Sequence, residues 1–424
     1  MQTRPGAFPR RQGTALQRFL VTGFVGAVLT SAGNFSASAT TNEKTEPSLK
    51  EKKEAVLATD PQILRTVGGH LIVGYYASWQ LTPLLERGAI GGIFVTRRNS
   101  RRRSKSKLAA ELTKFRELAA TKSTRPLWIA TDQEGGLVAH MTPPLRRQPS
   151  LAHAIKRAKS DEERDEIVQK FADEQALGLN ELGINLNFAP VVDLKPKKKL
   201  RRDRRTHLIR RAISREPGVV TEVAEEYCQA LKVWRVLCTL KHFPGLESIK
   251  ADTHINSASL SKSREDLETA DWIPFKELTT KTSAAMMIGH ARLDIIDPKT
   301  PASISKPVIS GLLRKEWGYD GLVITDDLDM GAIANEPGGL GRAAVEAMNA
   351  GADIVLLTQD GYGVYEILYA LIKAYQTGDL SKELLAESRK RLDKYAARYA
   401  PVAMKWPDDL PIPTPAPNRH ASVE

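Results

Sequence analysis

Residues 321–327 read GLVITDD, an apolar stretch of strand length that ends in two aspartates. The apolar residues from Gly321 to Thr325 suit a strand of a parallel sheet that is covered by helices. Asp326 and Asp327 do not continue that buried run, because burying an unpaired carboxylate is too costly. The stretch therefore predicts a strand that delivers carboxylates at its carboxyl end.

The same pattern recurs along the chain. Seven more apolar stretches of strand length occur, at residues 71–77, 91–96, 127–131, 186–192, 236–240, 284–289 and 354–357. Helical periodicity is found between them, at residues 107–121, 161–182, 219–233, 263–280, 307–317 and 340–349. Eight alternations of this kind are typical of parallel βα units. They predict an α/β fold with a single domain, a TIM-type (β/α)8 barrel.

In such a barrel, the loops that follow the carboxyl ends of the strands form the functional face. Charged residues follow several of the predicted strands, namely Asp132 and Glu134, Asp193, Lys241 and His242, His290, and Asp326 with Asp327. This convergence predicts an active site. For Asp326 alone, the cap of a following helix is an alternative, because aspartate caps helices well.

The stretch 241–254, KHFPGLESIKADTH, holds two of the eight histidines. Lys241 and His242 end a strand and can face the pocket, whereas the following Pro-Gly pair releases a loop that carries Asp252 and His254. On an extended segment these two side chains project to the same side, so the carboxylate can bind one imidazole nitrogen and leave the other for proton transfer. Such a pair can act as a general acid/base, although an isolated Asp-x-His can also be a surface coincidence.

These groups suit chemistry on a polyhydroxylated substrate. Such chemistry needs groups that hold hydroxyls, a carboxylate that attacks, and an acid that protonates the departing oxygen. A hydrolytic metal site built from His242, His254 and His290 is the competing interpretation, but the chain has no HExxH or similar close ligand spacing. It also lacks a phosphate-binding glycine motif and the Gly-x-Ser-x-Gly of serine hydrolases.

The two ends of the chain differ from the middle. Residues 1–39 contain four arginines, no acid, an apolar run and Ala-Ser-Ala at the end, which predicts a secretory signal and an exported, periplasmic or cell-surface protein. The apolar run is shorter than the ~20 residues that span a bilayer, so a permanent anchor is disfavoured. We expect a linker at 40–60, the barrel domain at 61–400 and a proline-rich tail at 401–424.

The formal net charge of +12 is concentrated in two basic runs. Residues 97–107 carry seven positive charges and no acid, and residues 195–211 carry ten against one aspartate. Both runs follow predicted strands, so an anionic cell-wall polymer is a candidate partner, whereas nucleic acid is not expected without interleaved aromatic residues or a binding motif. Cys228 and Cys238 are too few for a disulfide framework, and we expect both to be core residues.

Six stretches match one family in order. They are GGIFVTRRN from Gly91, TDQEGGLVAH from Thr131, INLNFAPVVDL from Ile184, KHFPG from Lys241 with DTH from Asp252, PASIS from Pro301, and GYDGLVITDDLDMGAI from Gly318. With them the chain resembles the β-N-acetylhexosaminidases of glycoside hydrolase family 3, of the single-domain bacterial N-acetylglucosaminidase type. The likeness covers roughly residues 63–380.

The resemblance implies a retaining glycosidase that removes terminal N-acetylglucosamine from peptidoglycan-derived, muropeptide-like fragments, without a metal or organic cofactor. Asp326 matches the nucleophile, His254 the general acid/base and Asp252 its partner. The residues expected to bind substrate are Asp132, Arg211, Lys241, His242, His140 and His290.

The chain also departs from the family. Residues 246–249 read LESI where the family usually has His-Gly-Asp-Thr, and Leu137 and His140 stand where it usually has arginines. These departures leave open a cell-wall glycan-binding protein with little or no activity. A relative that acts on β-glucosides, or by phosphorolysis, is the other alternative.

Overall fold

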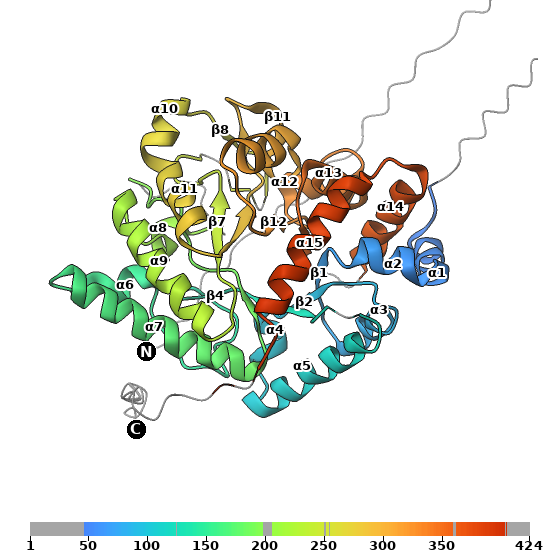
Figure 1. The fold of residues 1–424 in the computed structure, drawn as a ribbon, viewed down its shortest axis with the longest axis horizontal. Coiled ribbons are helices and arrows are strands. Elements are labelled where there is room, and N and C mark those ends of the chain that lie inside the picture. The colour runs from blue at the N-terminus through green and yellow to red at the C-terminus, as the bar shows by residue number, and fades with distance from the viewer. Residues whose placement is uncertain are drawn as a thin grey trace, which may run out of the picture. The chain divides into compact units, whose positions relative to one another are not determined.

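The computed structural model describes residues 46–123, 125–197, 206–249, 252–253, 255–358, 362–402 and 404. The unit that begins at Pro47 contains the whole barrel, and Glu46 is the one described residue before it. Its central sheet has eight strands (Figure 1). These are β1 (Leu71–Gly74), β2 (Gly92–Phe94), β3 (Trp128–Thr131), β6 (Leu186–Asn187), β7 (Thr239–Phe243), β9 (Ala285–Ile288), β12 (Val323–Asp327) and β13 (Ile354–Leu357).

The strands form a ring in chain order, and every neighbouring pair within the sheet is parallel. Two parallel bridges, Leu186 to Leu237 and Val191 to Lys241, join β6 to the β7 segment. The Asn187 N–H also donates to the Leu237 carbonyl at 2.8 Å. The predicted eight-stranded parallel barrel is therefore confirmed.

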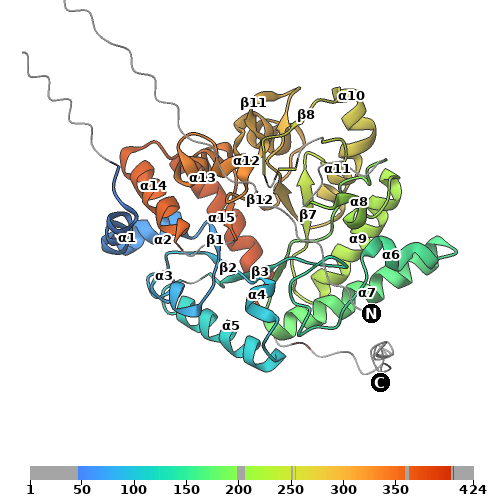
Figure 2. The ribbon, with the colours of Figure 1, turned by 180° about the vertical axis from the view of Figure 1, so that it is seen from behind.

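Helices surround this ring (Figure 2). The longer ones are α1 (Leu49–Ala58), α2 (Pro61–Gly68), α5 (Lys105–Ala120), α7 (Asp161–Leu182), α9 (Pro217–Val233), α11 (Trp272–Lys281), the π-helix η5 (Pro307–Glu316), α13 (Gly339–Ala350), α14 (Gly363–Thr377) and α15 (Lys382–Arg398). The sequence sets the ends of α7 clearly. The Ser160 hydroxyl caps its first turn by accepting from the Glu163 N–H, and Gly183 ends it with φ 77°.

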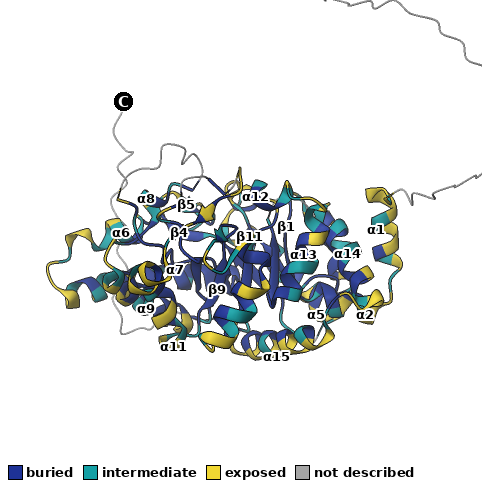
Figure 3. Ribbon diagram, turned by 90° about the horizontal axis from the view of Figure 1, so that it is seen from above, coloured by how far each residue is buried: buried dark blue, intermediate teal, exposed yellow. Residues whose placement is uncertain are grey.

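Alternate strand residues face opposite sides of the barrel wall. Ile72 belongs to an inner cluster, whereas Leu71 and Val73 belong to the cluster shared with the helices. The inner cluster also contains Leu392 and Tyr399, at the α15 end of the chain. α15 therefore covers one end of the barrel, and Figure 3 shows it on the side opposite β5 (Val138–Ala139), α8 (Leu208–Arg211) and α12 (Gly331–Ala334).

Three details differ from the sequence-based expectations. The predicted linker at 40–60 contains α1, which contacts α14. The strand predicted at 186–192 is shorter, because Pro190 has no N–H to donate to a ladder. Cys228 and Cys238 are buried as expected, but they are bonded to each other as a disulfide with Cα atoms 5.5 Å apart. Treating them as two separate core residues was wrong, because ten residues of separation bring them together across the turn from α9 to β7.

Two predicted segments lie outside the described residues, namely the signal at 1–39 and most of the tail at 401–424. Within the described ranges, none of the helices combines the length and the apolar character needed to span a bilayer.

Candidate active site

The loops at the carboxyl ends of the strands surround a cavity of about 420 Å³. This is within the usual range for a small-molecule site. Its walls include Tyr76, Arg97, Arg98, Asp132, His140, Arg211, Lys241, His242, Leu246, Thr253 and Asp326. Six of the nine predicted site residues therefore line one cavity, although they come from segments far apart in the chain.

Three of these charged residues form an ion network with Glu134. Lys241, at the end of β7, lies 2.6 Å from Asp132 Oδ1 and 2.7 Å from Glu134 Oε1. Arg211, at the end of α8, donates to both oxygens of Glu134, at 2.6 and 2.9 Å. Two cations and two carboxylates sum to zero, so the network can be buried, and the Lys241 side chain is only 2% exposed.

Pairing keeps this network ionised in spite of burial. Burial works against the Glu134 carboxylate, but Arg211 and Lys241 outweigh it and lower its pKa to about 2. Burial also works against the Lys241 ammonium, but Asp132 and Glu134 outweigh it and raise its pKa. Asp132 Oδ2 has no hydrogen-bond partner in the described part of the chain, and the side chain is 23% exposed. That oxygen can accept a substrate hydroxyl.

His242 is oriented by a buried aspartate. The fully buried Asp193 accepts from His242 N at 2.9 Å, His242 Nδ1 at 2.7 Å and Leu246 N at 2.8 Å. Because a carboxylate can only accept, Nδ1 carries a hydrogen. Nε2 has no partner among the described residues, so this second ring nitrogen can contact a substrate.

Asp326 and Asp327 end the same strand but differ in environment. Asp326 is half-buried, lines the cavity and accepts from the Asp327 N–H at 2.9 Å. Asp327 accepts from the N–H and the hydroxyl of Thr358, and burial raises its pKa to about 6. Asp327 therefore ties β12 to the residue after β13. The capping alternative for Asp326 fails, because the next helix, α12, has Met330 at its N-cap.

Only part of the predicted acid/base pair can be located. Asp252 is 6% exposed and accepts from the Thr206 hydroxyl at 3.2 Å. Its neighbour Thr253 lines the cavity, so this loop reaches the cavity wall. His254 lies outside the described residues, and its pairing with Asp252 stays a prediction.

The two other predicted histidines differ from each other. His140 lines the cavity and packs edge-on against Phe94, and burial lowers its pKa, so it forms a neutral wall. His290 is 1% exposed and does not line the cavity. Its Nε2 donates to the Asp327 carbonyl at 2.8 Å, which supports the backbone behind Asp326.

Glu134 and Asp193 hold Lys241, Arg211 and His242 in place. From the sequence, their positions after strands predicted only that they lie on the charged face of the barrel. Neither side chain has a pattern that reveals its partners. Arg97 and Arg98 on α4 (Arg97–Ser100) add positive charge to one wall, and the Arg98 guanidinium stacks on Tyr76 at 4.0 Å.

The arrangement is suited to glycosidic chemistry. A strand-held carboxylate opens into a cavity whose fixed charges can bind several hydroxyls. Among the described residues, no three His, Cys, Asp or Glu side chains form a group that could hold a metal ion.

Known proteins are similar to this chain in both sequence and fold. A model of the glycosyl hydrolase family 3 N-terminal domain matches residues 63–394. A β-hexosaminidase A from Pseudoalteromonas piscicida is 30% identical over 74% of this chain, which spans 54% of that protein. A β-hexosaminidase from Idiomarina loihiensis is 29% identical over 69% of this chain and 83% of its own length.

The structural similarity agrees. A family 3 β-N-acetylglucosaminidase from Paenibacillus sp. str. FPU-7 superposes with a TM-score of 0.72 at 29% identity, covering 83% of this chain and 66% of that one. The family model covers most of the chain and includes every strand of the barrel. The chain therefore belongs to glycosyl hydrolase family 3 and is a glycosidase.

Proposed function

We propose that this glycosidase releases terminal β-linked N-acetylglucosamine from peptidoglycan-derived fragments or related glycans, with retention of configuration. The named activities of its relatives, β-hexosaminidase and β-N-acetylglucosaminidase, support the choice of sugar. The observation that carries the proposal is the half-buried Asp326 carboxylate, which opens into the same cavity as the ion network of Lys241 and Arg211.

The reaction has two steps. In the first, an Asp326 oxygen attacks the anomeric carbon while His254 protonates the departing glycosidic oxygen, which leaves a glycosyl ester on Asp326. In the second, His254 takes a proton from water, the water oxygen attacks the same carbon, and Asp326 leaves as a carboxylate. Asp252 orients His254 and stabilises its protonated form, and acid/base assistance of this kind contributes roughly 10²- to 10⁴-fold in rate.

The ion network would hold the sugar for this reaction. Asp132 Oδ2 and His242 Nε2 are available for ring hydroxyls, whereas Arg211 and Glu134 fix the position of Lys241. Because the network is neutral and preorganised, it can bind hydroxyls without rearranging its charges.

Hydrolysis of a chromogenic β-N-acetylglucosaminide tests the proposal. We expect release by the wild type and loss of release in Asp326→Ala and His254→Gln. Asp320→Asn, which changes an exposed acid just before β12 that does not line the cavity, serves as the matched control. Release by Asp326→Ala at the wild-type rate would contradict the proposal. Adding inorganic phosphate separates hydrolysis from phosphorolysis, because only the latter forms a sugar 1-phosphate.

Export and a basic contact surface belong to the same proposal. The Cys228–Cys238 disulfide supports an oxidising compartment, and the mass of the protein secreted from cells would reveal whether residues 1–39 are removed. In the basic run 97–107, Arg103 and Lys105 pair with acids, whereas Arg97 and Arg98 have no acidic partner among the described residues. These two cations support contact with an anionic wall polymer, and such binding should weaken steeply as salt is raised.

A further inference from the structure

Three charged side chains meet beside the loop that follows β7. Glu247 belongs to this loop, Lys262 follows β8 (Ser259–Leu260), and Asp271 ends the π-helix η3 (Leu267–Asp271). Lys262 Nζ lies 2.5 Å from Glu247 Oε1 and 2.6 Å from Asp271 Oδ2. The Asp271 side chain is fully buried, and that of Glu247 is 10% exposed. One ammonium therefore pairs with two carboxyl groups that are almost completely buried.

The second carboxyl oxygen of each acid is not bonded to Lys262. Glu247 Oε2 and Asp271 Oδ1 are both buried and have no partner among the described residues when both acids are ionised. Both lie beside Gly245, because a Cβ on that residue would sit 3.4 Å from the first oxygen and 3.6 Å from the second. Two buried carboxylate oxygens side by side repel each other unless a proton lies between them. With one shared proton, the cluster carries one ammonium and one carboxylate and is neutral.

The electrostatics agree with a shared proton. Burial, together with the adjacent Glu247, raises the pKa of Asp271 to about 8. Burial opposes ionisation of Glu247 as well, but bonds from Asp271 and Lys262 outweigh it and lower its pKa. No other charged group is among the main influences on either acid, and Asp193, which follows β6, is bonded to His242 and Leu246.

We propose that Glu247, Lys262 and Asp271 form a proton-dependent latch that positions the loop after β7. Leu246, beside the latch, lines the cavity, and the chain then continues to Asp252. When the shared proton leaves, two carboxylates remain next to one ammonium, and their repulsion releases the loop.

The direction of the pH dependence follows from proton linkage. The closed latch binds a proton that a free aspartate, with a pKa of about 3.9, would have lost. The latch is therefore fully stabilised below about pH 4, and this stabilisation is lost as the pH rises through about 8. Between these limits, the equilibrium for closing weakens by at most about tenfold per pH unit.

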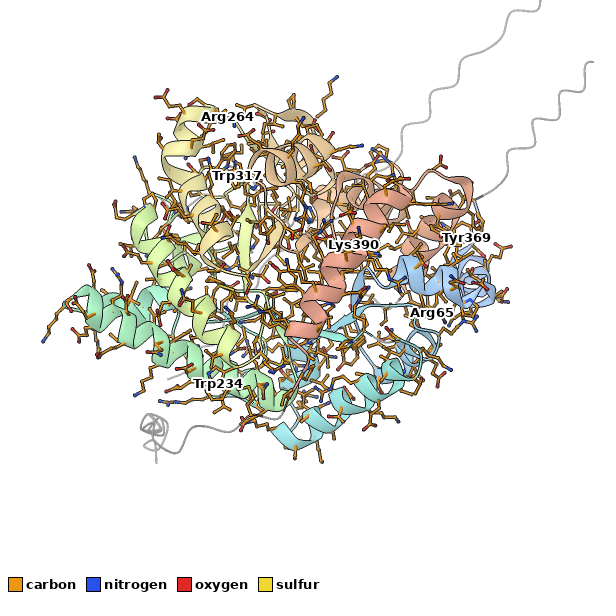
Figure 4. All side chains as sticks on the ribbon, viewed as in Figure 1. Arg65, Trp234, Arg264, Trp317, Tyr369 and Lys390 are labelled. Atoms are coloured by element: carbon orange, nitrogen blue, oxygen red, sulfur yellow. A yellow bond between two sulfur atoms is a disulfide. The ribbon has the colours of Figure 1, made fainter. Side chains whose placement is uncertain are left out.

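Trp272 is a built-in reporter of the latch. It follows Asp271 directly, and its Nε1 donates to the carbonyl of Pro244 at 3.1 Å. Its ring also stacks on Phe243 and packs edge-on against Trp317, which is labelled in Figure 4. Release of the loop would break the bond to Pro244 and change the fluorescence of this tryptophan.

The test is a fluorescence titration of the full-length protein from pH 5 to 9.5. We expect a transition in the wild type with a midpoint between pH 7 and 8.5, and none in Asp271→Asn. The asparagine amide can donate to Glu247 at every pH while its oxygen still accepts from Lys262. Glu268→Gln, an exposed change on the same π-helix at the partner of Arg264, should keep the wild-type transition (Figure 4 labels Arg264).

Two results would overturn the latch: no transition in the wild type, or an unchanged transition in Asp271→Asn. If Asp271→Asn does not fold, Glu247→Gln replaces it, because its amide donates to Asp271 in the same way. Trp272→Phe assigns the signal, since it should abolish the transition.

A second readout rests on the proposed function. As the latch opens above pH 8, kcat should fall severalfold more in the wild type than in Asp271→Asn, with KM changed less. Both proteins share His254, so the difference between their profiles isolates the latch. If neither protein hydrolyses the substrate, the proposed function fails, while the fluorescence result still decides the latch. Superimposable kcat profiles from two active proteins would show that the latch does not position the acid/base loop.

Discussion

Replacing Glu134 by glutamine tests the ion network at the centre of the cavity. The substitution keeps the size of the side chain but removes the negative charge that balances Lys241 and Arg211. Both cations are almost fully buried, with side-chain exposures of 2% and 9%. Breaking a buried ion pair in this way costs about 3–5 kcal/mol, because an uncompensated charge stays in the interior.

The lowered pKa of Glu134 leads to a similar free-energy cost for losing its charge. Its value of about 2 lies well below the ordinary glutamate value of about 4.3, and the difference corresponds to roughly 3 kcal/mol. For a domain of this size, about 2 °C in melting temperature corresponds to 1 kcal/mol, so Glu134→Gln should melt roughly 6–10 °C below the wild type at pH 7. Because the pKa is lowered, the stabilisation is present above about pH 4.3 and is lost as the pH falls through about 2.

Thermal unfolding followed by circular dichroism between pH 8 and pH 3 measures both effects. The difference in melting temperature between Glu134→Gln and the wild type should stay constant from pH 8 to pH 5 and become smaller toward pH 3. Glu166→Gln, on the exposed face of α7, is the matched control and should melt within about 1 °C of the wild type. Equal melting temperatures for Glu134→Gln and the wild type at pH 7 would refute the argument that this network is a balanced buried unit.

Three other changes have defined outcomes. Asp193→Asn loses charge-assisted bonds to three N–H groups. The free energy of unfolding, measured with denaturant, should therefore fall by about 1.5–3 kcal/mol, and kcat/KM should fall with it. An unchanged free energy of unfolding and an unchanged kcat/KM would contradict this. Replacing Cys228 and Cys238 together by serine opens a loop with a sequence separation of 10, and should cost about 2.5–3 kcal/mol in urea unfolding. A double variant as stable as the oxidised wild type would show that the disulfide adds nothing. Arg211→Lys keeps the charge but cannot make both bonds to Glu134, so KM should rise by more than kcat falls; kinetics with KM unchanged would count against its positioning role.

Much of the fold follows from local pattern. The eight apolar stretches coincide with the eight barrel strands, because strands covered by helices on one side and by the barrel interior on the other must be apolar on both faces. The ends of the strands were less predictable. Pro190 shortens the strand that begins at Leu186, and β7 runs on to Phe243, where the ladder with β9 continues past a bulge.

Site residues were predictable where the backbone delivers them directly and less so where tertiary contacts decide. Lys241, His242 and Asp326 lie at the carboxyl ends of strands, and each lines the cavity. His290 also follows a strand, but its ring bonds to the backbone of Asp327 instead, because side-chain direction depends on the local register. The Glu247 cluster has no sequence signature, since its three members meet only when η3 packs against the loop.

Asp326 is the group that becomes bonded to the sugar in the proposed reaction. Incubating the full-length protein with a slow fluorinated N-acetylglucosaminide, followed by intact mass measurement and peptide mapping, tests this directly. We expect one sugar per chain, attached to the peptide that contains Asp326, and no label in Asp326→Ala. A sugar attached elsewhere, or turnover of an active enzyme with no adduct under any slow substrate, would contradict the central claim.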